Sequence, residues 1–165
     1  MNKIVSLVVI AAFSLTAYGT HGAAALLRRV EGYRASPYLC QAGEWAIGYG
    51  FTAPSLIAKG SITQREAETE LNRICTAIQT RLRRELKHQR LTPNEEAAVI
   101  SFIYNVGWYR FKTSTMFRLL IHGKRGKIVA DEFRRWVYVS NGGRKVKSRG
   151  MQKRRMIEAS TFLKG

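Results

Sequence analysis

Apolar residues recur at helical spacing through most of the chain beyond residue 62. Thr63 and Glu66 have the spacing of a capping box, in which a hydroxyl and a carboxylate accept hydrogen bonds from backbone N–H groups at the start of a helix. Five apolar residues then fall on one face of the helix that follows: Ala67, Leu71, Ile74, Ile78 and Leu82. The pattern predicts one long helix that begins at Thr63 and ends at about Leu86.

A second capping box, Thr92-Pro93-Asn94-Glu95, predicts another helix, which Gly107 ends. Residues 97–106 are apolar except for Ser101 and Asn105, so this helix should be buried on most of its sides. Shorter helices are expected at about 114–122, 128–138 and 151–162, with a turn at Asn141-Gly142-Gly143 and a basic segment at 144–149 between the last two. This half of the chain is therefore predicted to form a mainly helical lobe.

The segment before the long helix has a different character. Leu26 to Tyr33 should form a short helix, because Pro37 disfavours helical geometry in the residue before it. Tyr38 to Cys40 and Trp45 to Phe51 then read as two strands, joined by a turn over Gln41 to Glu44. The prediction is an α+β fold, in which a small β-hairpin lobe and a mainly helical lobe are joined by the long helix.

The N-terminus has the features of a targeting segment. Lys3 precedes a stretch without formal charge that continues to Leu27, which is the pattern of a secretory signal. With its Gly/Ala-rich continuation through Ala25, the apolar stretch also reaches the roughly 20 residues that a bilayer requires. Two interpretations stay open: residues 1–25 are removed by a signal peptidase, after Gly19 or after Ala25, or they are retained as a weak membrane anchor. Both make residues 26–165 the folded domain.

The formal net charge of +17 and the pI near 10.6 predict attraction to a polyanion such as an anionic bacterial envelope, a membrane surface or nucleic acid. A solvated basic surface is an equally good interpretation, because the cations are spread over several predicted helices. The sequence contains no Gly-rich phosphate loop and no Ser/His/Asp arrangement, and its His and Cys residues lack the spacing of metal ligands. We therefore expect neither a metal nor a cofactor.

Glu31, at the end of the first predicted helix, is the main candidate for chemistry. Its neighbours in the sequence are apolar or aromatic and would disfavour the charged carboxylate by desolvation: Val30, Tyr33, Tyr38 and Trp45. A glycosidase needs such an acid to protonate the leaving oxygen. The alternative is an exposed helical glutamate paired with Arg34 or Arg28.

Several motifs occur in a fixed order along the chain. They are Glu31-Gly32-Tyr33-Arg34, Tyr38-Leu39-Cys40, Ile47-Gly48-Tyr49-Gly50, Leu91 to Asn94 with Ser101 to Gly107, Thr113-Ser114-Thr115, Arg134 to Tyr138, Asn141-Gly142-Gly143, and Gly150-Met151 with Arg154-Arg155 and Glu158. Together they resemble the phage-type lysozymes, the endolysins of tailed phages, over roughly residues 26–165. The resemblance implies a lysozyme-like fold and a muramidase that hydrolyses the β-1,4 bond between N-acetylmuramic acid and N-acetylglucosamine in peptidoglycan, and so lyses the host bacterium.

Some endolysins of this family carry a signal-anchor-release segment, which agrees with the second interpretation of residues 1–25. Either interpretation exports the domain across the bacterial inner membrane to the periplasm, where peptidoglycan lies. There the positive charge would hold it on the anionic envelope. We expect a monomer, and no nucleic-acid partner.

In this family the catalytic Glu is followed after eight residues by Asp, sometimes Cys, and after five more by Thr. The corresponding residues here are Glu31, Cys40 and Ala46. The resemblance therefore implies that Glu31 is the acid and that Cys40 positions or activates water, provided that its thiol is reduced and accessible. Ala46 has no hydroxyl to hold that water. The alternative function is thus a catalytically weakened lysozyme-fold protein that binds peptidoglycan.

For several other polar residues in or near these motifs, the sequence allows two roles. Cys40 and Cys75 either form a disulfide that would cap the proposed catalytic thiol or remain two free thiols. By similarity to the family, Ser101, Asn105 and Thr115 either line the floor of a sugar cleft or make hydrogen bonds in the core. Glu44 is a second candidate carboxylate only if the turn before it has a regular register.

Overall fold

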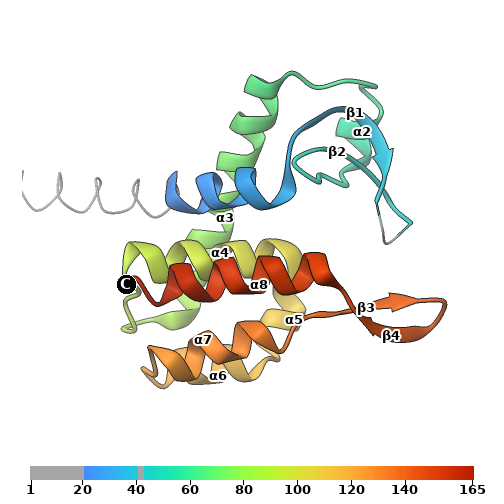
Figure 1. Ribbon diagram of the computed structural model, residues 1–165. Coiled ribbons are helices and arrows are strands. Elements are labelled where there is room, and N and C mark those ends of the chain that lie inside the picture. Colours follow the sequence, from blue (N-terminus) through green and yellow to red (C-terminus); the bar gives the residue numbers. More distant parts are fainter. Residues whose placement is uncertain (1–20, 41–42) are drawn as a thin grey trace, which may run out of the picture.

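The computed structural model describes residues 21–40 and 43–165. After a helix that ends at residue 31, the elements are β1 (Arg34–Leu39), β2 (Trp45–Gly48), α2 (Pro54–Ile57), α3 (Gln64–Leu86), α4 (Pro93–Val106), α5 (Trp108–Lys112), α6 (Thr115–Ile121), α7 (Lys127–Arg134), β3 (Tyr138–Asn141), β4 (Arg144–Lys147) and α8 (Arg149–Phe162). Figure 1 shows a small lobe of β1, β2 and α2 above a larger helical lobe, with α3 running between them. The predicted lysozyme-like α+β architecture is confirmed.

The starts of α3 and α4 follow from their sequences. Thr63 accepts a hydrogen bond from the N–H of Glu66, and the Glu66 carboxylate accepts one from the N–H of Thr63. The same reciprocal pair joins Thr92 and Glu95 at α4. Both capping boxes are therefore confirmed, and each satisfies two backbone donors that a helix start otherwise leaves open.

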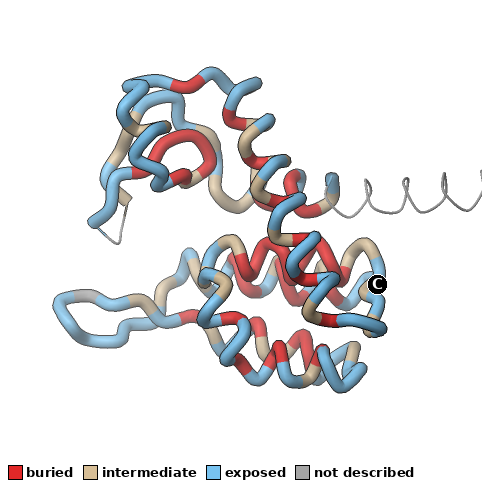
Figure 2. Tube along the Cα trace, turned by 180° about the vertical axis from the view of Figure 1, so that it is seen from behind, coloured by how far each residue is buried: buried red, intermediate tan, exposed pale blue. Residues whose placement is uncertain are grey.

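The core of the helical lobe is built around α4, which is buried along most of its length, as Figure 2 shows. Phe102 lies at its centre and makes edge-on contacts with the rings of Phe111, Phe133 and Trp136, with centroids 5.3–6.4 Å apart. Helix α8 packs along α4. This packing fixes the position of α8, whose Arg154 pairs with Glu31 at the end of the first described helix.

The helix that ends at residue 31 is part of this core. Ala23, Ala24 and Leu27 are fully buried, and a Cβ atom at Gly22 would lie 3.4 Å from the Cβ of Ala97 on α4. Of the predicted signal or anchor segment, residues 1–20 lie outside the described part of the chain. Within residues 21–40 and 43–165, no helix is long and apolar enough to cross a bilayer.

The small lobe differs in detail from the prediction. Strand β1 begins at Arg34 and includes Pro37, which is tolerated because β1 pairs on one side only. The ladder is irregular between Arg34 and Tyr38. Strand β2 stops at Gly48, and Phe51 turns back to exchange two backbone hydrogen bonds with Ile47. The predicted strand from Trp45 to Phe51 is therefore too long.

The region after α7 was also predicted incorrectly. Helix α7 ends at Arg134, and the chain then forms the antiparallel β3–β4 hairpin where the sequence suggested continued helix and a basic loop. Two glycines with positive φ, Gly142 and Gly143, make the tight turn that such a hairpin requires. Helix α8 starts at Arg149, two residues early, because Ser148 caps it. The short helices α2 and α5 were not predicted.

Candidate active site

Glu31 ends its helix between the two lobes, and its side chain is 21% exposed. Its Oε1 accepts a hydrogen bond of 2.5 Å from Nη1 of Arg154, which lies 123 residues away on α8. The alternative interpretation paired Glu31 with Arg34 or Arg28. Its partner is instead Arg154, so that interpretation is wrong. The ion pair joins the helix of Glu31 directly to the helical lobe.

Arg154 is itself held by a buried network. Its Nε donates to Oε1 of Glu158 at 3.0 Å, which confirms the ion pair expected at this helical spacing. Its Nη2 donates to the carbonyl oxygen of Ser101, whose hydroxyl donates to the same Glu158 oxygen at 2.7 Å. Arg155 donates to the other Glu158 oxygen at 2.5 Å. Two arginines thus face two carboxylates, so the buried charges compensate one another.

The second oxygen of Glu31 has a different environment. Within the described residues no hydrogen bond reaches Oε2, and a Cβ atom at Gly50 would lie 3.6 Å from it. Gly50 has a φ of +89°, a conformation that other residues rarely adopt. The chain therefore leaves this oxygen open beside the glycine, where a larger side chain would crowd it.

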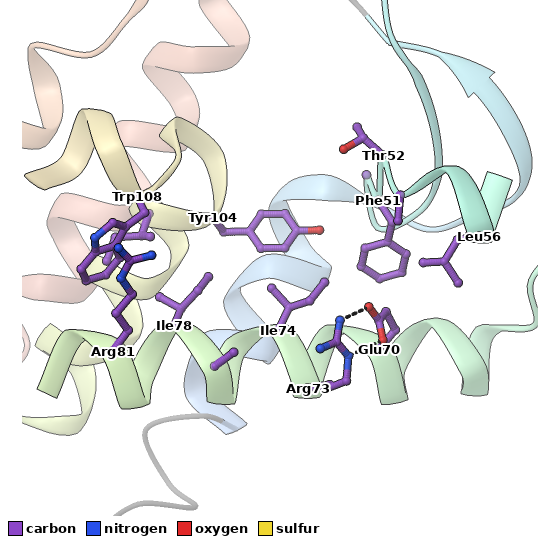
Figure 3. Close-up of a pocket in the computed structure, with 14 residues that line it drawn as sticks. Phe51, Thr52, Leu56, Glu70, Arg73, Ile74, Ile78, Arg81, Tyr104 and Trp108 are labelled. Carbon is purple, nitrogen blue, oxygen red and sulfur yellow. Dashed lines mark hydrogen bonds and ion pairs between the residues drawn. The ribbon is translucent and has the colours of Figure 1, made fainter. Parts of the chain in front are cut away.

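Gly50 is also part of the wall of a cleft of about 470 Å³. Figure 3 shows Phe51, Thr52 and Leu56 of the small lobe on one side and Arg81 and Trp108 at the other end, with α3 as the floor. Isoleucine and aromatic side chains dominate this wall, and two arginines lie along it: Arg73, paired with Glu70, and Arg81, stacked 4.2 Å from the Trp108 ring centroid. Apolar faces with a few polar groups suit a sugar chain.

Tyr104 crosses from α4 towards the small lobe inside this cleft (Figure 3). Its hydroxyl donates to the carbonyl oxygen of Tyr49 at 2.9 Å. Burial raises the pKa of Tyr104 far above its ordinary value, and the charge of Glu31 raises it further, so the phenol stays protonated. Tyr104 is therefore a permanent donor that ties the two lobes together beside the acid.

Cys40 directly follows β1 and is half-buried. Its backbone N–H donates to the carbonyl oxygen of Glu44, and its own carbonyl accepts from the N–H of Gly43, so the end of the hairpin closes on itself. Cys75 lies in the core on α3, where burial raises the pKa of its thiol to about 12. Of the two alternatives for these cysteines, the structure has the two free thiols.

Tyr38 lies in electrostatic reach of both proposed catalytic residues. Burial raises its pKa, and the neighbouring Glu31 and Cys40 raise it further, while Arg34, whose guanidinium lies 4.6 Å from the ring centroid, opposes them. In the β1–β2 ladder Tyr38 pairs with Ala46, so both side chains project from the same face. The sequence predicted Tyr38 as an aromatic neighbour of Glu31, but only the strand register places it opposite Ala46.

One interpretation of the sequence placed Ser101, Asn105 and Thr115 on the floor of a sugar cleft. None of the three lines the cleft of about 470 Å³ described above. Ser101 is buried and bonds Glu158, and the Asn105 side-chain oxygen accepts a hydrogen bond from Arg155. The Thr115 hydroxyl is exposed and accepts from Arg118 at 3.2 Å. For Ser101 the alternative of a core hydrogen bond is therefore the correct one, whereas Asn105 is exposed and its role at the cleft stays a prediction.

A semi-buried acid at a helix end, beside the Gly50 edge of a cleft between a hairpin lobe and a helical lobe, is the arrangement expected of a glycosidase of the lysozyme type. The chain belongs to the phage lysozyme family, since residues 28–158 match the family model described as "Phage lysozyme". It is thus a glycoside hydrolase whose substrate is peptidoglycan, and its fold and family are those that the sequence motifs predicted.

Curated relatives agree with this membership. An endolysin of Acyrthosiphon pisum secondary endosymbiont phage 1 is 34% identical over 137 residues, which cover 83% of this chain and 92% of that protein. A protein named SAR-endolysin from Bacteriophage PS119 is 31% identical over 136 residues, covering 82% of this chain and 78% of its own length.

Solved structures share the fold. An endolysin from Escherichia coli O157:H7 phage FAHEc1 superimposes with a TM-score of 0.73 at 27% identity, covering 86% of this chain and 90% of its own. The muramidase domain of SpmX from Asticaccaulis excentricus gives 0.74 at 28% identity, with 86% and 94% covered.

Proposed function

We propose that Glu31 is the general acid with which this lysozyme cleaves the β-1,4 bond between N-acetylmuramic acid and N-acetylglucosamine, and that the chain acts as an endolysin. The observation that carries the proposal is the asymmetry of the Glu31 carboxyl group. Arg154 holds Oε1 at 2.5 Å, whereas Oε2 is open beside Gly50 in the cleft wall. A proton on Oε2 would therefore face the leaving oxygen of a sugar bound there.

Arg154 would also stabilise the negative charge that Glu31 acquires during the reaction. When Glu31 gives its proton to the leaving oxygen, it becomes a carboxylate beside the guanidinium. Before that moment the charge of Arg154 is balanced by Glu158, which receives its Nε hydrogen bond. The attraction between Arg154 and Glu31 is thus strongest after proton transfer begins, and an interaction that strengthens towards the transition state accelerates the reaction.

On the water side, Cys40 positions or activates the attacking water from the β1–β2 hairpin, which is the role that the family resemblance implies for it. Its thiol is free and half-buried, which meets the two conditions for this role. Ala46 weakens the site, because its buried methyl group cannot hold water where the family has a threonine hydroxyl. This feature favours the second candidate function, a weakened lysozyme that binds peptidoglycan with little turnover.

Residues 1–25 export the domain to the periplasm and either remain as a membrane tether before release or are removed. Relatives named SAR-endolysin support the tether. The net charge of +17 holds the enzyme on the anionic envelope. It works as a monomer, since one chain supplies both proposed catalytic residues.

The test is the release of reducing sugar from purified peptidoglycan by the full chain, measured with and without reductant. Glu31→Gln should lower kcat by about 10²- to 10⁴-fold, the usual contribution of a general acid. Asp131→Asn is the matched control, because Asp131 is a partly exposed carboxylate on α7 that does not line the cleft, and its loss should leave the rate unchanged. Glu31→Gln with full activity would overturn the assignment. No release by any of the proteins, with peptidoglycan binding intact, would select the weakened binder.

A further inference from the structure

The β3–β4 hairpin lies in a strongly basic part of the chain. Residues 133–157 contain no acidic residue and nine basic ones: Arg134, Arg135, Arg144, Lys145, Lys147, Arg149, Lys153, Arg154 and Arg155. Four of them form ion pairs with carboxylates that lie outside residues 133–157: Arg134, Arg135, Arg154 and Arg155. Within the part of the chain that the structure describes, the other five form none. Three of these unpaired cations, Arg144, Lys145 and Lys147, belong to β4 and are called the hairpin cations below.

The hairpin is a regular ladder that presents these charges to solvent. Tyr138 pairs with Lys147 and Ser140 with Lys145, and directly opposed residues of an antiparallel ladder project from the same face. That face therefore carries two ammonium groups, a hydroxyl and a phenol ring, and Nζ of Lys147 lies 5.8 Å from the ring centroid. All four residues of β4 are exposed. The charges are thus available to a partner.

The base of the hairpin is fixed to the acid. The N–H of Ser148, just after β4, donates to the carbonyl oxygen of Val137, just before β3, and so closes the neck. Arg155 donates its Nε to the carbonyl oxygen of Trp136 and shares Glu158 with Arg154, the partner of Glu31. Figure 1 shows that the β1–β2 and β3–β4 hairpins extend from the two lobes towards the same side of the molecule, and Figure 2 agrees.

We propose that the exposed hairpin cations, Lys145 and Lys147 on this face and Arg144 at the turn, bind the acidic peptide stems of peptidoglycan next to the bond that is cleaved. The inference rests on the proposed function, because it requires the glycan to lie at Glu31. Stems branch from every muramic acid residue, so one stem always lies close to a scissile bond. Their carboxylates are the partners that unpaired lysine and arginine side chains bind.

An anionic membrane would meet the same charges, but the hairpin is a poor fit to it. Its exposed large apolar side chains are two, Tyr138 and Val146, which is little area for insertion at a bilayer surface. Its neck is also tied to the network of the catalytic acid, which places it beside the polymer being cut. The stem is therefore the occupant that both charge and position favour.

The test compares the full chain with a variant that neutralises the hairpin cations, Arg144→Gln/Lys145→Gln/Lys147→Gln. The substrates are purified glycan strands that carry their stems and the same strands after an amidase has removed the stems. The variant should lose about tenfold in kcat/KM on stem-bearing strands, as expected for three exposed ionic contacts of ordinary strength, and nothing on bare strands. The wild type should therefore prefer stem-bearing strands, and the variant should not.

The matched control is Arg84→Gln/Arg90→Gln/Lys124→Gln, which removes the same charge. These residues are exposed and form no ion pair with any described residue, and they lie near the α3–α4 and α6–α7 connections, at the end of the helical lobe away from the hairpin (Figure 1). The control should match the wild type on both substrates. An equal loss in the two variants would mean that net charge alone acts, and would overturn the proposal.

Two further outcomes contradict the inference. One is an unchanged substrate preference in the hairpin variant. The other is weaker binding to phosphatidylglycerol vesicles with unchanged cleavage of stem-bearing strands, which would assign the hairpin to a lipid surface. If the wild type cleaves neither substrate, the proposed function fails separately. Binding of stem-bearing strands then decides the inference, since the hairpin variant should bind them about tenfold more weakly than the control variant.

Discussion

The two sides of the candidate active site are built very differently. The acid side consists of Glu31, Arg154, Arg155, Glu158 and Ser101, which are linked by ion pairs and hydrogen bonds from three helices. The water side consists of Tyr38, Cys40 and Ala46 on one irregular hairpin, where the Cys40 backbone is held by the turn alone.

This difference indicates which of the proposed catalytic groups is firmly held and which is not. A carboxyl group held by a compensated, buried network keeps its orientation without help from the substrate. A water molecule beside a methyl group and a thiol has fewer fixed partners. We therefore expect substitutions on the acid side to affect stability as well as activity, and substitutions on the water side to affect activity alone.

The largest effect is expected for Glu158→Ala. Glu158 is fully buried and accepts hydrogen bonds from both arginines, so its removal leaves two buried guanidinium groups with one carboxylate. The free energy of unfolding should fall by about 3–5 kcal/mol, measured by urea denaturation. Asp131→Asn, which breaks exposed pairs with Lys127 and Arg134, is the control and should cost no more than about 1 kcal/mol. Equal losses would show that the network has no special role.

The next effect is expected for Cys40→Ala, which should lower kcat by about 10²-fold if the thiol acts on water, with unchanged stability. Cys75→Ala is the control and should keep full activity. Because burial raises the pKa of Cys75 to about 12, its thiol stays protonated at pH 8 and does not react, so iodoacetamide should modify Cys40 alone at that pH. Activity that survives both the substitution and the alkylation would remove Cys40 from the mechanism.

A smaller effect concerns the helix that carries the acid. Ala23 and Ala24 are buried in the core, so a chain of residues 26–165 loses this packing and a chain of residues 21–165 keeps it. The shorter chain should be less stable by about 2 kcal/mol, measured by thermal and urea unfolding of both. Equal stability would show that the first turn does not anchor Glu31. A signal peptidase site after Ala25 would then remain compatible with a stable domain.

The smallest effect, and the one that improves the enzyme, is expected for Ala46→Thr. The new hydroxyl would project from the hairpin face that carries Tyr38 and could hold water there. Reducing-sugar release should rise about tenfold, which corresponds to one added hydrogen bond in the transition state. Ala46→Val, which adds a similar volume without a hydroxyl, should give no increase. A gain in both variants would point to packing, and a gain in neither would show that water is positioned by other groups.

The elements that were predicted correctly share one property, which is that their signals are local. The capping boxes of α3 and α4 and the apolar stripe between Ala67 and Leu82 involve residues three or four positions apart, whose contacts form in any helix. The β3–β4 hairpin was missed although Asn141-Gly142 is a turn signal, because the helical pattern before it extends past Arg134. Contact of Trp136 with Phe102 and its hydrogen bond to Arg155 help to direct the chain out of the helix.

The amino-acid sequence by itself determined the two-lobe architecture and the family and named Glu31 as the candidate acid, because these depend on helical periodicity, caps and short motifs. Tertiary structure alone decided how the acid is held. Arg154 lies 123 residues from Glu31, and no local pattern specifies which arginine it meets. The packing of α8 along α4 makes that choice, and the strand register alone places Tyr38 opposite Ala46. Contacts over such separations depend on how whole elements pack, which a linear pattern does not encode.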